Sequence, residues 1–184
     1  MRDADRLKQE VADAMLKWEI DHMTSTNHHS PYGGAHQTPN RIIVHAMGEF
    51  VMADGGDSYD YAPEFLERMK LSAHALVAPD GTVIRCRLDN EGAYHARGFN
   101  VDSLGIEMLV AGQHDYGSFV GAIAQPYLTD AQYAAAVAQC REWVQKHKIT
   151  RIDRHSEVSP GRKLDPGSGF PFLEFKKAVF NDVA

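Results

Sequence analysis

Hydrophobic positions recur at helical spacing in two long segments of the chain. In residues 3–22 the apolar side chains stand three or four positions apart, and these are Leu7, Val11, Ala14, Met15 and Trp18. A second segment, residues 129–147, opens with Thr129 and Gln132 at the spacing of a capping box, and its apolar face consists of Tyr133, Val137, Cys140 and Val144. The pattern predicts two amphipathic helices, and a shorter helix over residues 172–180.

Shorter apolar runs between these helices predict β-strands. Residues 41–45, 103–110 and 149–155 each gather β-branched or aliphatic side chains over a length typical of a buried strand. Residues 71–88 contain two further runs separated by Asp80-Gly81, and an Asp-Gly pair is a strong signal for the tight turn of a β-hairpin. The sequence therefore predicts five strands, two of them joined as a hairpin.

The order of the predicted elements indicates the fold class. A short helix is expected at residues 63–70, and Gly-, Pro- and polar-rich loops at 24–40 and 156–169. Strands that alternate with helices predict an α/β fold, a single domain with a central mixed β-sheet flanked by helices. We expect residues 1–40 to add an N-terminal amphipathic helix and loop to a catalytic domain at residues 41–184.

Composition and charge exclude several classes of protein. The chain has 184 residues, 24% of them charged, and a net charge of −6, so it lacks the broad positive field of a nucleic-acid-binding domain. It contains no apolar run long enough to cross a bilayer, and no apolar segment near the N-terminus resembles a Sec signal. We expect synthesis in a bacterial cytoplasm, no nucleic-acid partner and no membrane insertion, with the oligomeric state open.

Two polar residues interrupt predicted strands. His45 closes the apolar run at residues 41–45, where its ring faces either the core or a cleft at the end of the strand. Glu107 alternates with Ile106, so it shares a face with Gly105 and Leu109. A buried carboxyl has a raised pKa, which suits a general base. A satisfied structural histidine and a glutamate on an exposed edge strand are the open alternatives.

A third polar group lies in the loop at residues 154–167, where His155, Lys163 and Asp165 stand among prolines and glycines. With His45 these residues supply two imidazoles and one carboxylate, the ligands of a catalytic zinc site that keeps its fourth position open for water. From spacing alone, an ordinary loop that happens to carry these side chains remains the alternative.

At this point the motifs resemble a known family, the zinc-dependent N-acetylmuramoyl-L-alanine amidases of the amidase-2 and peptidoglycan-recognition superfamily. The matching segments span roughly residues 41–175 in the family's order, and they are Ile-Ile-Val-His45, Leu-Ser-Ala-His74, Ala-Tyr-His95-Ala-Arg-Gly, Asn100 to Glu107, Tyr-Leu-Thr-Asp-Ala-Gln-Tyr, and His155 to Gly167.

The resemblance implies a role for each matching residue. It implies that His45, His155 and Asp165 bind one Zn²⁺, that Glu107 is the catalytic acid and base, and that Lys163 assists at the oxyanion. The implied reaction is hydrolysis of the amide bond between the lactyl group of N-acetylmuramic acid and L-alanine, so the expected partner is peptidoglycan or a muropeptide.

Further positions bear on the subtype and on the substrate. Asp165 as third ligand, with Glu107, matches the recycling amidases and many phage amidases, whereas Tyr94 departs from the tryptophan that recycling enzymes carry there. His95, Asn100 and Arg97 are expected to contact substrate, and the alternatives are a structural role for the first two and a solvated surface position for Arg97.

Three functions remain open. The first is an endolysin-like bacteriolytic hydrolase that degrades the polymeric cell wall after release from the cell, and the second performs the same reaction on soluble anhydro-muropeptides in the cytoplasm. The third is a non-catalytic peptidoglycan-binding module, which is disfavoured because the ligands, Glu107 and Lys163 are all in place. We expect the first, because residues 1–40 and the lack of the recycling enzymes' intervening loops depart from the second.

Overall fold

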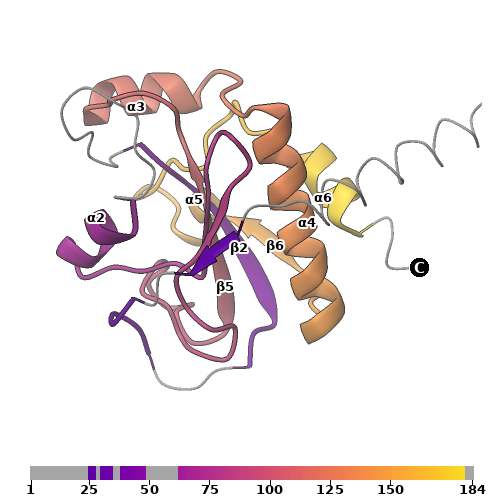
Figure 1. The fold of residues 1–184 in the computed structure, drawn as a ribbon. Helices are drawn as coiled ribbons and strands as arrows, with labels where there is room; N and C mark the ends of the chain where they lie inside the picture. The colour runs from indigo at the N-terminus through magenta and orange to yellow at the C-terminus, as the bar shows by residue number, and fades with distance from the viewer. Residues whose placement is uncertain (1–24, 28–29, 35–37, 49–61, 181–184) are drawn as a thin grey trace, which may run out of the picture.

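A six-stranded mixed β-sheet forms the centre of the molecule, as the computed structural model shows for residues 25–27, 30–34, 38–48 and 62–180 (Figure 1). The strand order is β1-β4-β3-β5-β2-β6. All neighbouring strands are parallel except β3 and β4, which form the predicted hairpin. The strands are β1 Ser25–Asn27, β2 Arg41–Met47, β3 Ala75–Val77, β4 Val83–Arg85, β5 Ser103–Leu109 and β6 Ile152–Arg154.

Helices cover both faces of this sheet. They are α2 Ala62–Arg68, α3 Tyr116–Ile123, α4 Asp130–His147, α5 His155–Val158 and α6 Phe172–Phe180. Figure 1 shows α4 and α6 side by side on one side of the sheet, with α2 on the other. The predicted α/β class with a helix-flanked mixed sheet is confirmed. Among the helices of the described residues, none has the length and apolar character needed to cross a membrane.

Side chains of the two central strands, β2 and β5, point alternately to the two faces of the sheet, so core residues lie on one face and site residues on the other. The residues of β2 and β5 that pack against α4 and α6 are Ile42, Val44, Leu104, Ile106 and Met108. Side chains between them point to the other face, where Leu109 belongs to a second hydrophobic cluster that includes Leu66 of α2. Glu107 therefore lies on the face of Gly105 and Leu109, as its sequence position predicted, and His45 lies on the same face.

Most predicted elements are present with adjusted ends. β2 extends the predicted strand by two residues, and α6 covers the predicted helix at residues 172–180. In the hairpin, Gly81 adopts a φ of 87° in the turn, a conformation that glycine tolerates without a Cβ clash. The paired strands are only three residues long each, so much of the predicted run at residues 71–88 is irregular chain.

Three parts of the prediction need correction. Residues 24–40 were expected to be loop, yet β1 lies there and pairs with β4. The strand expected at residues 149–155 is limited to Ile152–Arg154, and α5 begins at His155 and extends into the loop expected at residues 156–169. α3 was not predicted at all. The helix expected at residues 3–22 lies outside the described residues, and a domain boundary at residue 40 remains a prediction.

Gln132 connects α4 to the sheet in a way that its sequence position does not reveal. The Thr129 side chain accepts a hydrogen bond from the Gln132 backbone N–H at 3.0 Å, as a capping residue should. The side chain of Gln132 does not complete the box. It is fully buried, and its Nε2 donates to the carbonyls of Val77 at 2.8 Å and Leu109 at 2.9 Å.

A buried carboxylate, Asp89, joins the hairpin to the last turns of α4. It accepts hydrogen bonds from Trp143 Nε1 at 3.0 Å, Lys146 Nζ at 2.7 Å and His147 Nε2 at 3.0 Å, and it pairs with Arg85. Burial alone would raise the pKa of Asp89, but the hydrogen bonds from His147 and Lys146 and the charge of Arg85 hold it well below its usual range. The carboxylate therefore stabilises the fold.

We expect Asp89→Asn to lower the free energy of unfolding at pH 7 by about 3–5 kcal/mol, because removing one partner leaves buried donors and Arg85 without a counter-charge. Because the folded pKa lies below the unfolded value of about 3.9, the contribution is complete above that pH and is lost as the pH falls toward the folded pKa. The deficit should therefore shrink in acid. Urea unfolding at several pH values measures it.

The matched control is Lys146→Ala, which removes a partner whose side chain is 57% exposed. Exposed ion pairs contribute at most about 1 kcal/mol, so this variant should unfold close to wild type. Equal losses in the two variants would contradict a special contribution of the buried carboxylate.

Candidate metal centre and active-site cleft

Three parallel strands deliver functional side chains to one edge of the sheet. His45 lies near the carboxyl end of β2 and is the register partner of Glu107 on β5. β6 pairs with the other side of β2, and His155 follows its last residue. The carboxyl ends of parallel strands are the usual place for ligand sites in α/β sheets. The topology therefore gathers residues that are more than a hundred positions apart in the chain.

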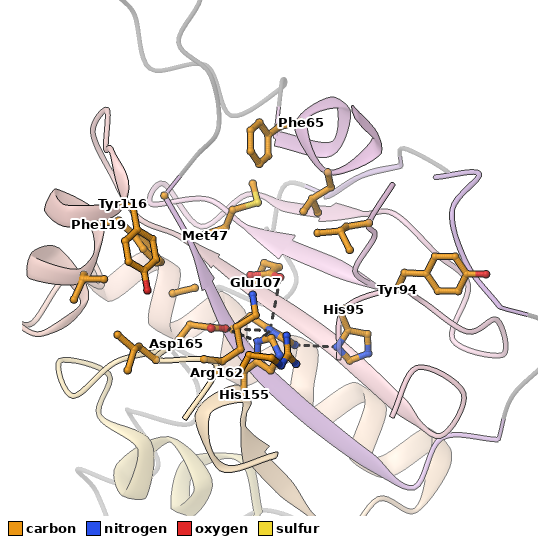
Figure 2. A pocket seen from close by; sticks show the side chains of 18 of the residues that line it. Met47, Phe65, Tyr94, His95, Glu107, Tyr116, Phe119, His155, Arg162 and Asp165 are labelled. Carbon is orange, nitrogen blue, oxygen red and sulfur yellow. Dashed lines mark hydrogen bonds and ion pairs between the residues drawn. The ribbon is translucent and has the colours of Figure 1, made fainter. Parts of the chain in front are cut away.

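The ligand atoms of His45, His155 and Asp165 converge on one point, and Figure 2 labels His155 and Asp165 of this group. Nδ1 of His45 lies 2.8 Å from Nδ1 of His155 and 3.2 Å from Oδ2 of Asp165, and the last two atoms are 2.9 Å apart. All three residues are at most 8% exposed. Burial lowers the pKa of His45 to about 4. Burial would raise the pKa of Asp165, but its contacts with His155 and His45 hold it well below its usual range.

The donor chemistry of this group fits a metal ion. Two imidazole nitrogens and a carboxylate oxygen face one another, and each neutral ring carries only one proton. Such a cluster of lone pairs is costly in a buried place unless a cation balances it. Two histidines and one carboxylate are also the ligands of catalytic zinc sites with an open fourth position. The buried group can therefore hold a metal ion.

Glu107 stands beside this group. Its Oε1 lies 3.8 Å from Nδ1 of His45, and the residue is 8% exposed. Burial, followed by the negative charge of Asp165, raises the pKa of Glu107 to about 8, while the charge of Lys163 acts in the opposite direction. The direction agrees with the expectation from its place in an apolar strand. Without a metal the carboxyl group holds its proton at neutral pH, and a nearby divalent cation would favour the carboxylate.

A cleft opens above these side chains. Figure 2 shows Phe65 of α2 and Tyr116 and Phe119 of α3 on its walls, across from the buried group. Tyr116 and Leu164 line the cleft and remain 67% and 55% exposed. Sequence reasoning missed these walls, because apolar residues in short helices and loops are normally counted as core. Large exposed apolar side chains are the structural signal that identifies them.

The cleft contains most of the site residues that the sequence predicted. Its lining includes His45, His95, Glu107, His155, Lys163 and Asp165. Arg97 and Asn100 are not among the lining residues. Asn100 Oδ1 accepts hydrogen bonds from the backbone N–H groups of His95 at 3.2 Å and Ala96 at 2.9 Å, so it closes the local turn. Substrate contacts of Arg97, Asn100 and His95, and the roles of the other residues, stay predictions.

Sequence comparison places the chain among amidases. Residues 35–168 match the family described as N-acetylmuramoyl-L-alanine amidase. The chain is 28% identical over 180 residues to the 1,6-anhydro-N-acetylmuramyl-L-alanine amidase AmpD of Enterobacter cloacae. The aligned region covers 86% of this chain and 90% of that protein. AmpD of Escherichia coli strain K12 is 27% identical over 169 residues, with 80% and 86% covered.

A solved structure shares the fold. The endolysin N-acetylmuramoyl-L-alanine amidase LysCS from Clostridium intestinale URNW superimposes with a TM-score of 0.65 at 25% sequence identity. The match covers 87% of this chain and 97% of the endolysin. The likeness therefore extends over nearly the whole of that solved chain.

Proposed function

Because the chain belongs to the N-acetylmuramoyl-L-alanine amidase family, we propose that it cleaves the lactyl–L-alanine amide bond of soluble 1,6-anhydro-muropeptides. The family match confirms the resemblance that the motifs indicated, and amidase activity on peptidoglycan follows from it and from the AmpD relatives. The observation that carries the proposed site is the convergence of His45, His155 and Asp165 beside Glu107.

The soluble form of the substrate is supported by two relatives. The proteins from Enterobacter cloacae and Escherichia coli are named for a 1,6-anhydro-muramyl substrate, and this chain covers at least 86% of each. This support reverses the preference drawn from the sequence, which put the polymeric wall first. The likeness to LysCS supports wall degradation as the second candidate. On the first proposal the reaction takes place in the cytoplasm, and on the second it follows release from the cell.

The buried group would hold the cofactor of this reaction. His45 and His155 would bind Zn²⁺ through their Nδ1 atoms, and Asp165 through Oδ2, since these are the atoms that converge. Zinc bound there supplies a Lewis acid beside Glu107 and makes water a usable nucleophile near neutral pH.

Glu107 and Lys163 would move protons and stabilise charge in the cleft. The Glu107 carboxylate accepts the proton of the attacking water as the new C–O bond forms at the lactyl carbonyl. The Lys163 ammonium donates a hydrogen bond to the oxyanion that develops there. Glu107 then gives its proton to the L-alanine nitrogen as the C–N bond breaks. The products are a free lactyl carboxylate and a stem peptide with an L-alanine amino terminus.

The role of Lys163 predicts a loss of turnover without loss of metal. Lys163→Met keeps most of the side-chain length and removes the charge, so kcat should fall by about 10²–10³-fold, the usual effect of removing one oxyanion donor. Zinc content should stay at the wild-type level, and Lys146→Ala, an exposed lysine on α4 outside the cleft, should keep full activity. Wild-type turnover in Lys163→Met would contradict this role.

A comparison of two substrates tests the proposed function. Zinc-loaded protein is given intact sacculi in one reaction and soluble anhydro-muropeptides in the other, each with a chelated control, and products are identified by mass spectrometry. Release of stem peptides from the soluble substrate alone supports the proposal. Release from sacculi at a comparable rate would transfer the support to the second candidate. No release from either would contradict both.

A further inference from the structure

His95 lies between the metal centre and the backbone of β5. The ligand group of the proposed metal centre, His45, His155 and Asp165, is called the histidine–aspartate group below. The His95 ring is half-buried, and Figure 2 shows it beside this group, with a dashed line between them. Its Nδ1 is 2.9 Å from Nε2 of His45, and its Nε2 is 3.1 Å from Ser103 Oγ. Both ring nitrogens of His95 are therefore engaged inside the protein. A substrate hydrogen bond to either nitrogen, as the sequence suggested, would have to replace one of these contacts.

Gly105 makes the space for this ring. A Cβ added at Gly105 would lie 2.6 Å from Cγ and Nδ1 of His95, a distance that side-chain contacts do not reach. Next to it, His74 Nδ1 accepts a hydrogen bond from the Gly105 N–H at 3.0 Å, and its Nε2 donates to the Glu91 carbonyl at 2.8 Å. The ring centroids of His74 and His95 are 5.8 Å apart. The position of the His95 ring is thus fixed from the strand as well as from the cleft.

The direction of each hydrogen bond between Ser103, His95 and His45 follows from the contact of the Ser103 hydroxyl group. Ser103 Oγ lies 2.5 Å from the Phe99 carbonyl, and a carbonyl only accepts, so the hydroxyl hydrogen is used there. Ser103 Oγ must then accept from Nε2–H of His95. A neutral imidazole has one N–H, so Nδ1 of His95 carries a lone pair and accepts from Nε2–H of His45. The remaining nitrogen of His45, Nδ1, is left with its lone pair facing His155 and Asp165.

We propose that His95 is a positioning residue that holds His45 in the Nε2–H tautomer, with its Nδ1 lone pair directed at the metal. The inference rests on the zinc site of the proposed function. Hydrogen-bond partners behind a metal ligand fix its tautomer and orientation, and their removal typically costs about 10–100-fold in metal affinity. His155 has no such partner among the described residues, because its buried Nε2 makes no hydrogen bond there.

Two substitutions of similar shape distinguish the effect of losing the hydrogen-bond acceptor of His95 from the effect of changing its side-chain volume. His95→Asn places Oδ1 near the position of Nδ1 and can still accept from His45, whereas His95→Leu puts a methyl group there. Zinc affinity, measured on metal-free protein by competition with a chelator, should fall by about 10–100-fold in His95→Leu. His95→Asn should recover most of that loss. Thermal unfolding of the metal-free proteins establishes that both variants are folded.

The nitrogen resonances of the histidines give an independent measurement on the unaltered chain. In zinc-loaded protein with ¹⁵N-labelled histidine, His45 should show a protonated Nε2 and a metal-bound Nδ1, and His95 a protonated Nε2 and an unprotonated Nδ1. A protonated Nδ1 on His95 would overturn the proposal, even if a variant failed to fold. Equal zinc affinity in the two variants would overturn it as well. A wild-type chain that binds no zinc would overturn the metal site itself, which separates the two failures.

Discussion

Glu107→Gln should lower kcat by about 10²–10⁴-fold, the range that a positioned general acid and base contributes, while one zinc ion stays bound. Glutamine has nearly the same shape but cannot accept the proton of the attacking water or deliver it to the amine. Turnover measured on a soluble muropeptide, together with metal analysis of the same sample, checks both halves. The matched control is Glu142→Gln, an exposed carboxylate on α4 outside the cleft, which should keep wild-type turnover.

The same substitution has a predicted effect on stability. Burial raises the pKa of Glu107 to about 8 in the metal-free protein. A group with a raised folded pKa contributes its full stability below the unfolded value of about 4.3, and loses it as the pH rises through the folded value. Metal-free wild type should therefore lose stability relative to Glu107→Gln between about pH 4.3 and pH 8. A Glu107→Gln enzyme with wild-type turnover would contradict the catalytic role.

Asp165→Asn should strongly weaken zinc binding and lower activity with it. The amide keeps the size of the carboxylate but removes the charge that balances the metal. We therefore expect zinc affinity to fall by more than about 100-fold, which exceeds the usual effect of losing a residue that only hydrogen-bonds to a metal ligand. Competition with a chelator measures the affinity, and turnover at saturating zinc measures how much activity returns.

A second buried aspartate provides the control. Asp153 on β6 is 7% exposed and pairs with Arg151 at 2.7 Å, but it does not line the cleft. Asp153→Asn should therefore lose stability and keep its zinc. If Asp165→Asn retained wild-type zinc affinity, or if both variants lost zinc equally, the assignment of Asp165 as a ligand would be wrong.

The predicted elements that are present share strong local signals. β2 and β5 are apolar runs buried on both faces, and α4 has a capping residue and a continuous apolar face. β1 lacks these signals, and α3 has a capping residue, Asp115, but no continuous apolar face. Ser25–Asn27 is a polar tripeptide whose strand structure depends on pairing with β4, and α3 contains two glycines and is largely exposed. Pairing partners distant in sequence and the geometry of a cleft wall leave no periodic pattern for sequence analysis to detect.

The sequence predicted which residues form the candidate site better than it predicted the hydrogen bonds between them. His45, Glu107, His155 and Asp165 stood out as polar residues in apolar strands or in a rigid loop, and the family motifs gave them roles. His95 was expected at the substrate. Its two ring contacts, to His45 and Ser103, join segments that only the folded sheet brings together, so nothing local could indicate them. Gln132 shows the same limitation, since its side-chain partners lie on two separate strands.

The central claim is that the buried histidine–aspartate group holds zinc for hydrolysis at the lactyl carbonyl. Cleavage of a soluble anhydro-muropeptide in water enriched in ¹⁸O, by zinc-loaded, chelated and reloaded protein, tests it most directly. The account predicts one ¹⁸O atom in the lactyl carboxylate, an unlabelled stem peptide beginning with L-alanine, loss of cleavage on chelation and recovery with one zinc ion per chain. Cleavage that persists without metal, or ¹⁸O found in the peptide instead, would contradict it.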